Sequence, residues 1–163
     1  MPATLCGLEI PERSYSPLFG PGKRITRDDH YVKLGSKVAS SQGCYYYVDG
    51  MRTVYVSGEW VKPNDEAAPS TPYEAVMEHK PVDKPRKYPG RYEVVTWGRG
   101  AVAGLDCARA PGDDDASFTR YLIDIYANDT ELNDDPDRAH KTFGKLAQVV
   151  MAEAAGKLSC AGG

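Results

Sequence analysis

Apolar and polar positions alternate most clearly on the two sides of Asp49-Gly50. Residues 44–48 and 52–56 are rich in tyrosine, valine and threonine, which are enriched in strands. An Asp-Gly pair accepts the positive φ angles of a tight type I′ turn. The sequence therefore predicts a β-hairpin over residues 44–56 that turns at Asp49-Gly50.

Four further segments have the residue types and spacing of strands. They are residues 30–34, 91–97, 101–108 and 118–126. Each segment is bounded by glycine, proline, serine or clustered aspartate, which favour turns. Together with the hairpin, these segments predict an antiparallel sheet of about five or six strands.

The end of the chain has the apolar spacing of a long α-helix. Asp135 suits the N-cap, Pro136 suits the first turn, and Asp137 complements the positive end of the helix dipole. One apolar stripe then recurs every three or four positions: Phe143, Leu146, Ala147, Val150, Ala154 and Leu158. We expect this helix to pack across the sheet, so the predicted fold class is α+β with a long C-terminal helix.

Two other segments contain prolines that limit regular structure. Residues 12–19 predict a short helix that Pro17 interrupts. Residues 61–90 contain six prolines among many charges and predict a long connection, with one helical turn near residues 73–79. We interpret residues 1–163 as a single α+β domain that contains this Pro-rich connection.

Length and charge narrow the class of protein. The chain has 163 residues, of which 41% are hydrophobic, which is enough for one core. Its formal net charge is -3 at pH 7, whereas proteins that bind nucleic acid carry a basic excess. We therefore expect no nucleic-acid partner. No apolar run approaches the roughly 20 residues of a membrane span, and the first residues lack the pattern of a secretory signal.

The four cysteines are the most informative residues: Cys6, Cys44, Cys107 and Cys160. A zinc knuckle needs closely paired thiols and a redox pair needs C-x-x-C, and the chain has neither pattern. The spacing favours two disulfides over buried free thiols, which implies folding in an oxidising compartment. Four cysteines allow three connectivities. We favour Cys6–Cys44 with Cys107–Cys160, because this choice pairs each half of the chain with itself.

A short motif surrounds each cysteine: Leu5-Cys6-Gly7, Gly43-Cys44, Leu105-Asp106-Cys107 and Leu158-Ser159-Cys160. With a tryptophan strand before the third motif and an alanine-rich helix before the fourth, the chain resembles uncharacterised actinobacterial exported domains. These are ectodomains of lipoproteins or of single-span membrane proteins of unknown function. The resemblance implies an exported location, membrane contact only through an N-terminal anchor outside the given sequence, and no catalytic residues. No lipobox-like segment precedes Cys6.

The sequence offers no catalytic motif. The G-x-S-x-G pattern of a nucleophile elbow is missing, and we interpret the scattered His30, His79 and His140 as surface or partly buried side chains. Residues 129–137 present oxygen ligands at alternate positions, as Ca²⁺ requires, but lack the EF-hand's central glycine and have His140 where its glutamate belongs. We interpret this segment as a solvated loop with capping acids. We expect no catalytic residue, no metal and no cofactor.

The tyrosines provide a candidate binding surface. Tyr45 and Tyr47 lie on one face of the predicted strand and Tyr46 on the other, because side chains alternate along a strand. Outward tyrosine rings can stack on sugar rings or on partner proteins. The simpler alternative is that they pair with Tyr55 on the neighbouring strand and only stabilise the sheet. We select Tyr45, Tyr47 and Tyr55 as the candidate surface.

These observations together predict a non-enzymatic extracytoplasmic domain that binds or supports a component of the cell envelope, either a protein or a glycan. The tyrosine hairpin and residues 61–90 are the expected contact surfaces. Two alternatives stay open: an envelope hydrolase with an unfamiliar site, and an intracellular protein with reduced cysteines. A deep polar pocket that gathers a histidine, an acid and a hydroxyl would favour the hydrolase.

Overall fold

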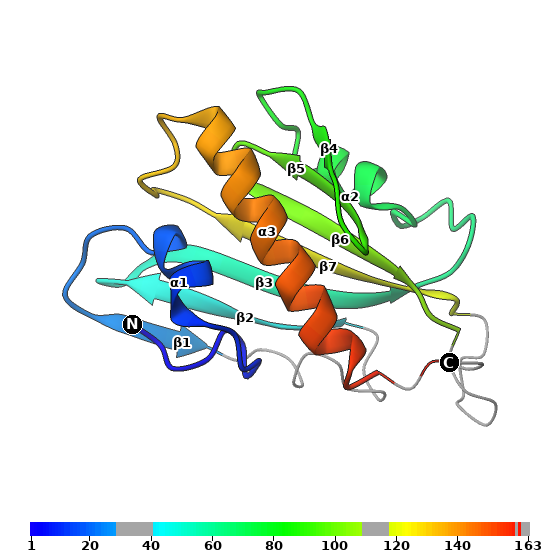
Figure 1. Ribbon diagram of the computed structural model, residues 1–163, viewed down its shortest axis with the longest axis horizontal. Helices are drawn as coiled ribbons and strands as arrows, with labels where there is room; N and C mark the ends of the chain where they lie inside the picture. Colours follow the sequence, from blue (N-terminus) through cyan, green and yellow to red (C-terminus); the bar gives the residue numbers. More distant parts are fainter. Residues whose placement is uncertain (29–40, 109–117, 159, 161–163) are drawn as a thin grey trace.

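Seven antiparallel strands form one sheet in the computed structural model, which describes residues 1–28, 41–108, 118–158 and 160 (Figure 1). The strands are β1 (Ile25–Asp28), β2 (Ser41–Val48), β3 (Met51–Val61), β4 (Arg86–Tyr88), β5 (Glu93–Trp97), β6 (Gly100–Asp106) and β7 (Arg120–Ala127). Their order across the sheet is β1-β2-β3-β7-β6-β5-β4. The α+β fold class is confirmed, and the sheet is larger than the expected five or six strands. The strand predicted at residues 30–34 lies outside the described residues.

The hairpin of β2 and β3 forms where the sequence predicts it. Asp49 and Gly50 have φ angles of 50° and 85°, and these are the left-handed values that a type I′ turn needs. Between Tyr46 and Tyr47 the pairing shifts by one residue, so that Thr53 of β3 is bulged. Such a bulge strengthens the local twist of the strands.

The long C-terminal helix covers one face of the sheet. Helix α3 (Pro136–Ala155) is capped by Asp135, whose side chain accepts a hydrogen bond of 3.0 Å from the backbone N–H of Arg138. The predicted apolar stripe is buried against β5, β6 and β7, and the helix runs obliquely across these strands (Figure 1). The predicted cap and stripe are therefore confirmed.

The N-terminal segment covers the same face beside α3. It contains α1 (Glu12–Tyr15) and a 3-10 helix, η1 (Ser16–Leu18). The predicted helix over residues 12–19 changes from α to 3-10 at Ser16, just before Pro17, because proline cannot donate the α-helical backbone hydrogen bond. The buried side chains of this segment join those of α3 and the sheet in the main core: Leu5, Leu8, Ile10, Tyr15, Leu18 and Phe19.

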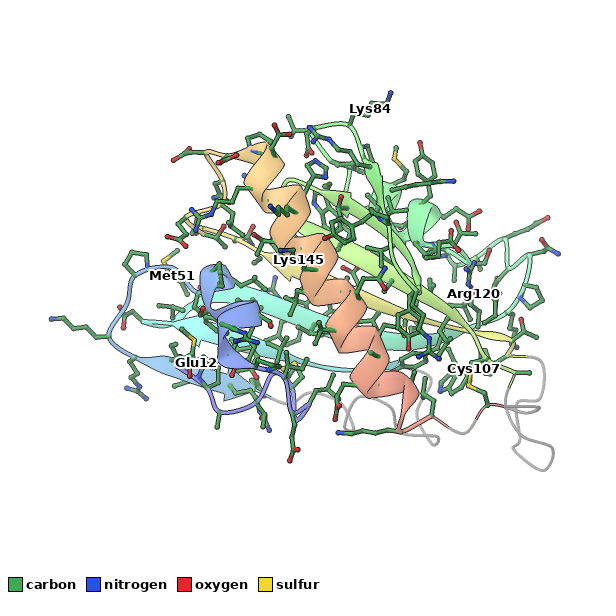
Figure 2. The ribbon with its side chains drawn as sticks, viewed as in Figure 1. Glu12, Met51, Lys84, Cys107, Arg120 and Lys145 are labelled. Carbon is green, nitrogen blue, oxygen red and sulfur yellow. A yellow bond between two sulfur atoms is a disulfide. The ribbon has the colours of Figure 1, made fainter. Side chains whose placement is uncertain are left out.

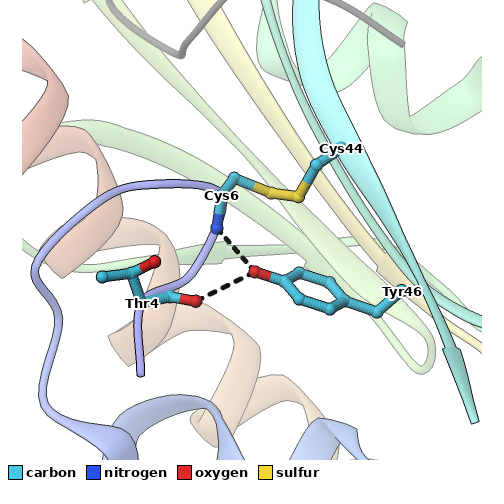
Figure 3. Close-up of a disulfide and its surroundings, with 4 residues drawn as sticks. All are labelled: Thr4, Cys6, Cys44 and Tyr46. Carbon is cyan, nitrogen blue, oxygen red and sulfur yellow. Dashed lines mark hydrogen bonds between the residues drawn. A yellow bond between two sulfur atoms is a disulfide. The ribbon is translucent and has the colours of Figure 1, made fainter. Parts of the chain in front are cut away.

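Two disulfides hold the ends of the chain to the sheet, with the predicted pairing. Cys6–Cys44 joins the N-terminal segment to β2, and Cys107–Cys160 joins the end of β6 to the residues after α3. Beside the first bond, the Tyr46 hydroxyl accepts from the Cys6 N–H at 2.8 Å and donates to the Thr4 carbonyl at 2.9 Å (Figure 3). The disulfide and the tyrosine together fix this segment over β2.

A short helix covers part of the opposite face. Helix α2 (Pro72–Glu78) begins with a capping box in which Thr71 and Glu74 exchange hydrogen bonds. It packs on β5 and β6, where a second apolar cluster forms: Val61, Ala75, Val76, Val95, Trp97, Val102 and Leu122. The helical turn predicted near residues 73–79 is confirmed.

The proposed connection over residues 61–90 contains one strand that the sequence did not indicate. Strand β4 pairs with β5 through three residues, with Arg86 opposite Thr96. It is an edge strand that lies close to Pro85 and Pro89. Proline is tolerated at sheet edges, where one side of the strand needs no ladder hydrogen bond. Pairing with β5, which lies outside residues 61–90, therefore makes residues 86–88 a strand.

Candidate functional site

The face of the sheet opposite α3 is the candidate site. Helix α2 packs mainly on β5 and β6 of this outer face, while β2, β3 and β7 present partly exposed side chains beside it. Tyr46 is fully buried on the α3 side, whereas Tyr45, Tyr47 and Tyr55 are partly exposed. Alternation therefore places Tyr45, Tyr47 and Tyr55 on the outer face.

Aromatic rings cross this face from β2 to β5. The rings of Tyr45 and Tyr55 stack with centroids 4.7 Å apart. Tyr126 of β7 stands directly opposite Tyr55 in the register. The His79 ring stacks on Trp97 at 4.6 Å and on Tyr126 at 5.4 Å. We call Tyr45, Tyr55, Tyr126, His79 and Trp97 the aromatic row.

Gly100 makes room for the end of the aromatic row. It is paired with Tyr126 on β7 and with Trp97 on β5. A Cβ atom at this position would overlap the Trp97 ring and the Ile125 carbonyl oxygen. Glycine therefore lets the indole lie flat across β6 and approach Tyr126.

A pocket of about 220 Å³ opens at the hairpin end of the aromatic row. Its lining comes from β2, β3 and the end of β7: Tyr45, Arg52, Thr53, Val54, Tyr55, Tyr126 and Asn128. The Arg52 guanidinium lies 5.1 Å from the centre of the Tyr45 ring, in cation–π geometry. The Tyr126 hydroxyl donates to the Asn128 side-chain oxygen. Tyr47 lies on the same face but outside the pocket lining.

The carboxyl groups of Asp124 on β7 and Glu59 on β3 lie farther along this face, and Asp124 contacts the imidazole of His79. His79 Nε2 is 2.6 Å from Asp124 Oδ2, and both side chains are about one-fifth exposed at 22%. Burial opposes the charged imidazole, but the hydrogen bond to Asp124 and the charges of Asp124 and Glu78 outweigh it, so the pKa of His79 is raised. Burial raises the pKa of Asp124 despite the opposing effect of His79. Burial, and then the charge of Asp124, raise the pKa of Glu59.

His140 belongs to a different and buried polar group. Its Nε2 lies 2.8 Å from Asp83 Oδ2, and its Nδ1 lies 2.6 Å from the Thr96 hydroxyl. That hydroxyl donates to the Arg86 carbonyl at 3.2 Å, and Asp83 accepts from the Gly98 N–H at 2.9 Å. His140 is 5% and Thr96 1% exposed. The group therefore ties α3 to β5 and the loop before β4 and offers no accessible nucleophile.

The acidic segment before α3 is used in local structure. Asp135 caps α3, Asp137 pairs with Arg86 at 2.6 Å, and Glu131 pairs with Arg138 at 2.8 Å. Within the described ranges, no group of three histidine, cysteine or acidic side chains has the geometry to hold a metal ion. These contacts agree with the interpretation of residues 129–137 as a loop with capping acids.

The structure places the three selected tyrosines on one face and adds residues that the sequence did not single out for binding. Arg52, Tyr126 and Asn128 complete the pocket. Tyr126 ends the alternating run at 118–126, so its outward orientation had a sequence signal. Its position beside Tyr55 had none, because that position depends on the register of β3 with β7. His30, interpreted from the sequence as a surface or partly buried histidine, lies outside the described residues.

The described helices include none with both the length and the apolar character needed to cross a bilayer. Comparison with models of known protein families, with curated proteins and with solved structures finds no match to this chain.

Proposed function

We propose that the chain is a non-enzymatic binding domain that works outside the cytoplasm and contacts its partner through the outer sheet face. The aromatic row is the observation that supports this most: rings from four strands and from His79 at the C-terminal end of α2 gather on a face that α3 does not cover. Aromatic side chains are enriched at binding surfaces because they combine a large apolar area with few rotatable bonds. Tyr45, Tyr47 and Tyr55 form the proposed contact surface.

The disulfides support a site of action in an oxidising compartment. All four cysteines are paired, and stable disulfides are typical of exported proteins. The alternative of an intracellular protein depended on reduced cysteines and loses that support. The proposed location is the actinobacterial cell envelope, because the cysteine motifs resemble those of actinobacterial exported domains. The proposed anchor lies outside the given sequence. The proposed partner there is an envelope protein or a glycan.

The histidine groups favour binding over hydrolysis. The Asp83–His140–Thr96 group combines an acid, an imidazole and a hydroxyl, but all three are occupied by one another and by backbone groups beneath α3. His79 Nε2 contacts Asp124, and its ring stacks on Trp97 and on Tyr126, whose hydroxyl donates to Asn128. A hydrolase needs a nucleophile or an activated water that substrate can reach. We therefore retain the binding function.

Retention on envelope material tests this function. Purified wild-type protein is incubated with envelope extract of the native host, and the bound fraction is measured by sedimentation. The Y45S/Y47S variant should stay folded, with a somewhat lower thermal unfolding midpoint because the Tyr45–Tyr55 stack is lost. It should lose about tenfold or more of its apparent affinity, because stacked aromatic contacts contribute about 1 kcal/mol each. Y73S is the matched control, since Tyr73 is 55% exposed on α2, away from the pocket lining.

Two results would contradict the proposal. Equal retention of Y45S/Y47S and wild type would remove the outer face from the contact surface. No retention of wild-type protein by any envelope fraction would remove the binding function itself.

A further inference from the structure

Polar and aromatic groups are arranged in sequence along β3 and β7. Arg52 and Asn128 lie at the hairpin end, where the Asn128 N–H donates to the Thr53 carbonyl at 2.8 Å. Tyr55 and Tyr126 come next, as a cross-strand pair. Ser57 and Asp124 form the following outward pair, and Glu59 lies beyond them on β3. Along the strands the face therefore changes from hydrogen-bond donors, through aromatic rings, to carboxyl groups.

The hairpin end of this arrangement has donors available. Arg52 is exposed and lies over the Tyr45 ring, and it makes no ion pair with any residue in the described ranges. The Asn128 side-chain oxygen accepts from Tyr126, which leaves the amide N–H₂ group without a partner in the described part of the chain. A guanidinium and an amide donor at one pocket suit the two oxygens of a carboxylate.

The size and exposure of the pocket limit the ligand to one small ring. Its volume of about 220 Å³ is below the roughly 300–1,000 Å³ of sites for drug-sized ligands. It lies on an open sheet face, so one side of a bound ring stays in water. A pyranose tolerates that position because its C–H face stacks on tyrosine while its hydroxylated edge remains hydrated. A flat aromatic acid would leave an apolar face exposed.

We infer that this pocket binds one sugar ring that carries a carboxylate, with the ring between Tyr55 and Tyr126 and the carboxylate at Arg52 and Asn128. The inference rests on the proposed function and specifies its ligand as an acidic glycan. Glu59 lies farther along β3, outside the pocket lining, and its carboxyl group disfavours a second carboxylate at that end. The acidic group therefore points toward the hairpin.

A matched pair of sugars tests the inference. Methyl β-D-glucuronide and methyl β-D-glucoside differ only in a carboxylate against a hydroxymethyl group. Each is titrated into ¹⁵N-labelled protein with intact disulfides at low salt. We expect the glucuronide to shift the amide signals of residues 52–55 and 126–128, and to bind about tenfold or more tightly than the glucoside, as a charge-assisted hydrogen bond provides.

Arginine variants separate the pocket from general charge effects. R52Q should bind the glucuronide about tenfold more weakly and no better than the glucoside. R91Q is the matched control, because Arg91 also lies over a tyrosine ring, at 5.5 Å from Tyr92, and does not line the pocket. It should leave the affinity unchanged. Equal losses in R52Q and R91Q would overturn the site assignment.

Further outcomes distinguish the inference from the proposed function. Equal binding of the two sugars, or tighter binding of benzoate or of glucose 6-phosphate, would overturn the assignment to a sugar carboxylate. Envelope retention that Y45S/Y47S abolishes, without glucuronide binding, would overturn the inference and keep the proposed function. A protein partner would then be the expected occupant. If wild-type protein shows neither envelope retention nor glucuronide binding, both the inference and the proposed function are overturned.

Discussion

His79 Nε2 lies 2.6 Å from Asp124 Oδ2, which joins the C-terminal end of α2 to the middle of β7. The two residues are 45 positions apart in the chain, and the His79 ring is also stacked on Trp97 and on Tyr126. One ion pair therefore connects the position of α2 with the aromatic row, so its protonation affects the candidate site.

The first prediction concerns the pH dependence of stability. Because Asp124 and Glu78 raise the pKa of folded His79 above its ordinary value of 6.5, the folded protein binds this proton more tightly than the unfolded chain. The stabilisation is complete below pH 6.5 and is lost as the pH rises through the folded pKa. The raised pKa of Asp124 acts in the same direction at lower pH. H79Q should cost about 1.5–3 kcal/mol at pH 6 and less at pH 9.

Urea denaturation of wild type and H79Q between pH 5 and pH 9 measures this difference. Glu59 is present in both proteins, and its pKa is raised chiefly by its own burial, so its contribution largely cancels in the comparison. A difference in unfolding free energy that stays constant, or that grows with pH, would contradict the raised pKa of His79.

The second prediction concerns the buried group around His140. T96V keeps the shape of the side chain but removes the hydroxyl that His140 and the Arg86 carbonyl contact. The variant should lose about 1–3 kcal/mol of unfolding free energy, because buried polar atoms remain without a partner. T26V is the matched control, since Thr26 is exposed on edge strand β1, and it should change by less than about 0.5 kcal/mol. Similar urea midpoints for T96V and wild type would contradict a structural role.

The third prediction concerns the disulfides. Non-reducing peptide mapping should recover crosslinks Cys6–Cys44 and Cys107–Cys160. The double variants C6S/C44S and C107S/C160S should each lose about 2–5 kcal/mol, since each bond closes a long loop of the unfolded chain. Thermal unfolding with and without reductant measures the effect, and the variant without cysteines should not respond to reductant. Recovery of four free thiols from native protein would contradict the pairing.

The fourth prediction concerns the contact between α3 and β4. A Cβ atom at Gly144 would overlap the Tyr88 ring, so G144A should lower stability by about 1–3 kcal/mol. We expect this loss of stability even though alanine favours a helix by about 1 kcal/mol over glycine. In a Y88A background the clash is absent, and G144A should become neutral or stabilising. G156A is the control, because a Cβ atom there would lie 3.6 Å from the Glu153 carbonyl oxygen, an ordinary contact distance. Destabilisation by G144A in the Y88A background would contradict the overlap.

Local features of this fold could be predicted because neighbouring residues decide them. The Asp49-Gly50 turn needs only two residues that accept positive φ, and the N-cap at Asp135 involves an N–H three positions away. The apolar stripe of α3 follows from helix periodicity. The disulfide pairing was also predicted, as one choice among three, and the structure brings Cys107 beside Cys160. Cys107 and Arg120 lie toward one end of the sheet, with Met51 at the other (Figure 2).

Contacts between distant segments decided the rest. Alternation along a single strand is enough to place Tyr45 and Tyr47 on one face and Tyr46 on the other, so this pattern can be predicted from neighbouring residues. That this face is outward, and that Tyr55 stands beside Tyr126, follows from contacts between separate elements. These positions depend on how β3 and β7 pair across about 70 intervening residues. They also depend on which face α3 covers, since burying its apolar stripe leaves the tyrosines on the other side.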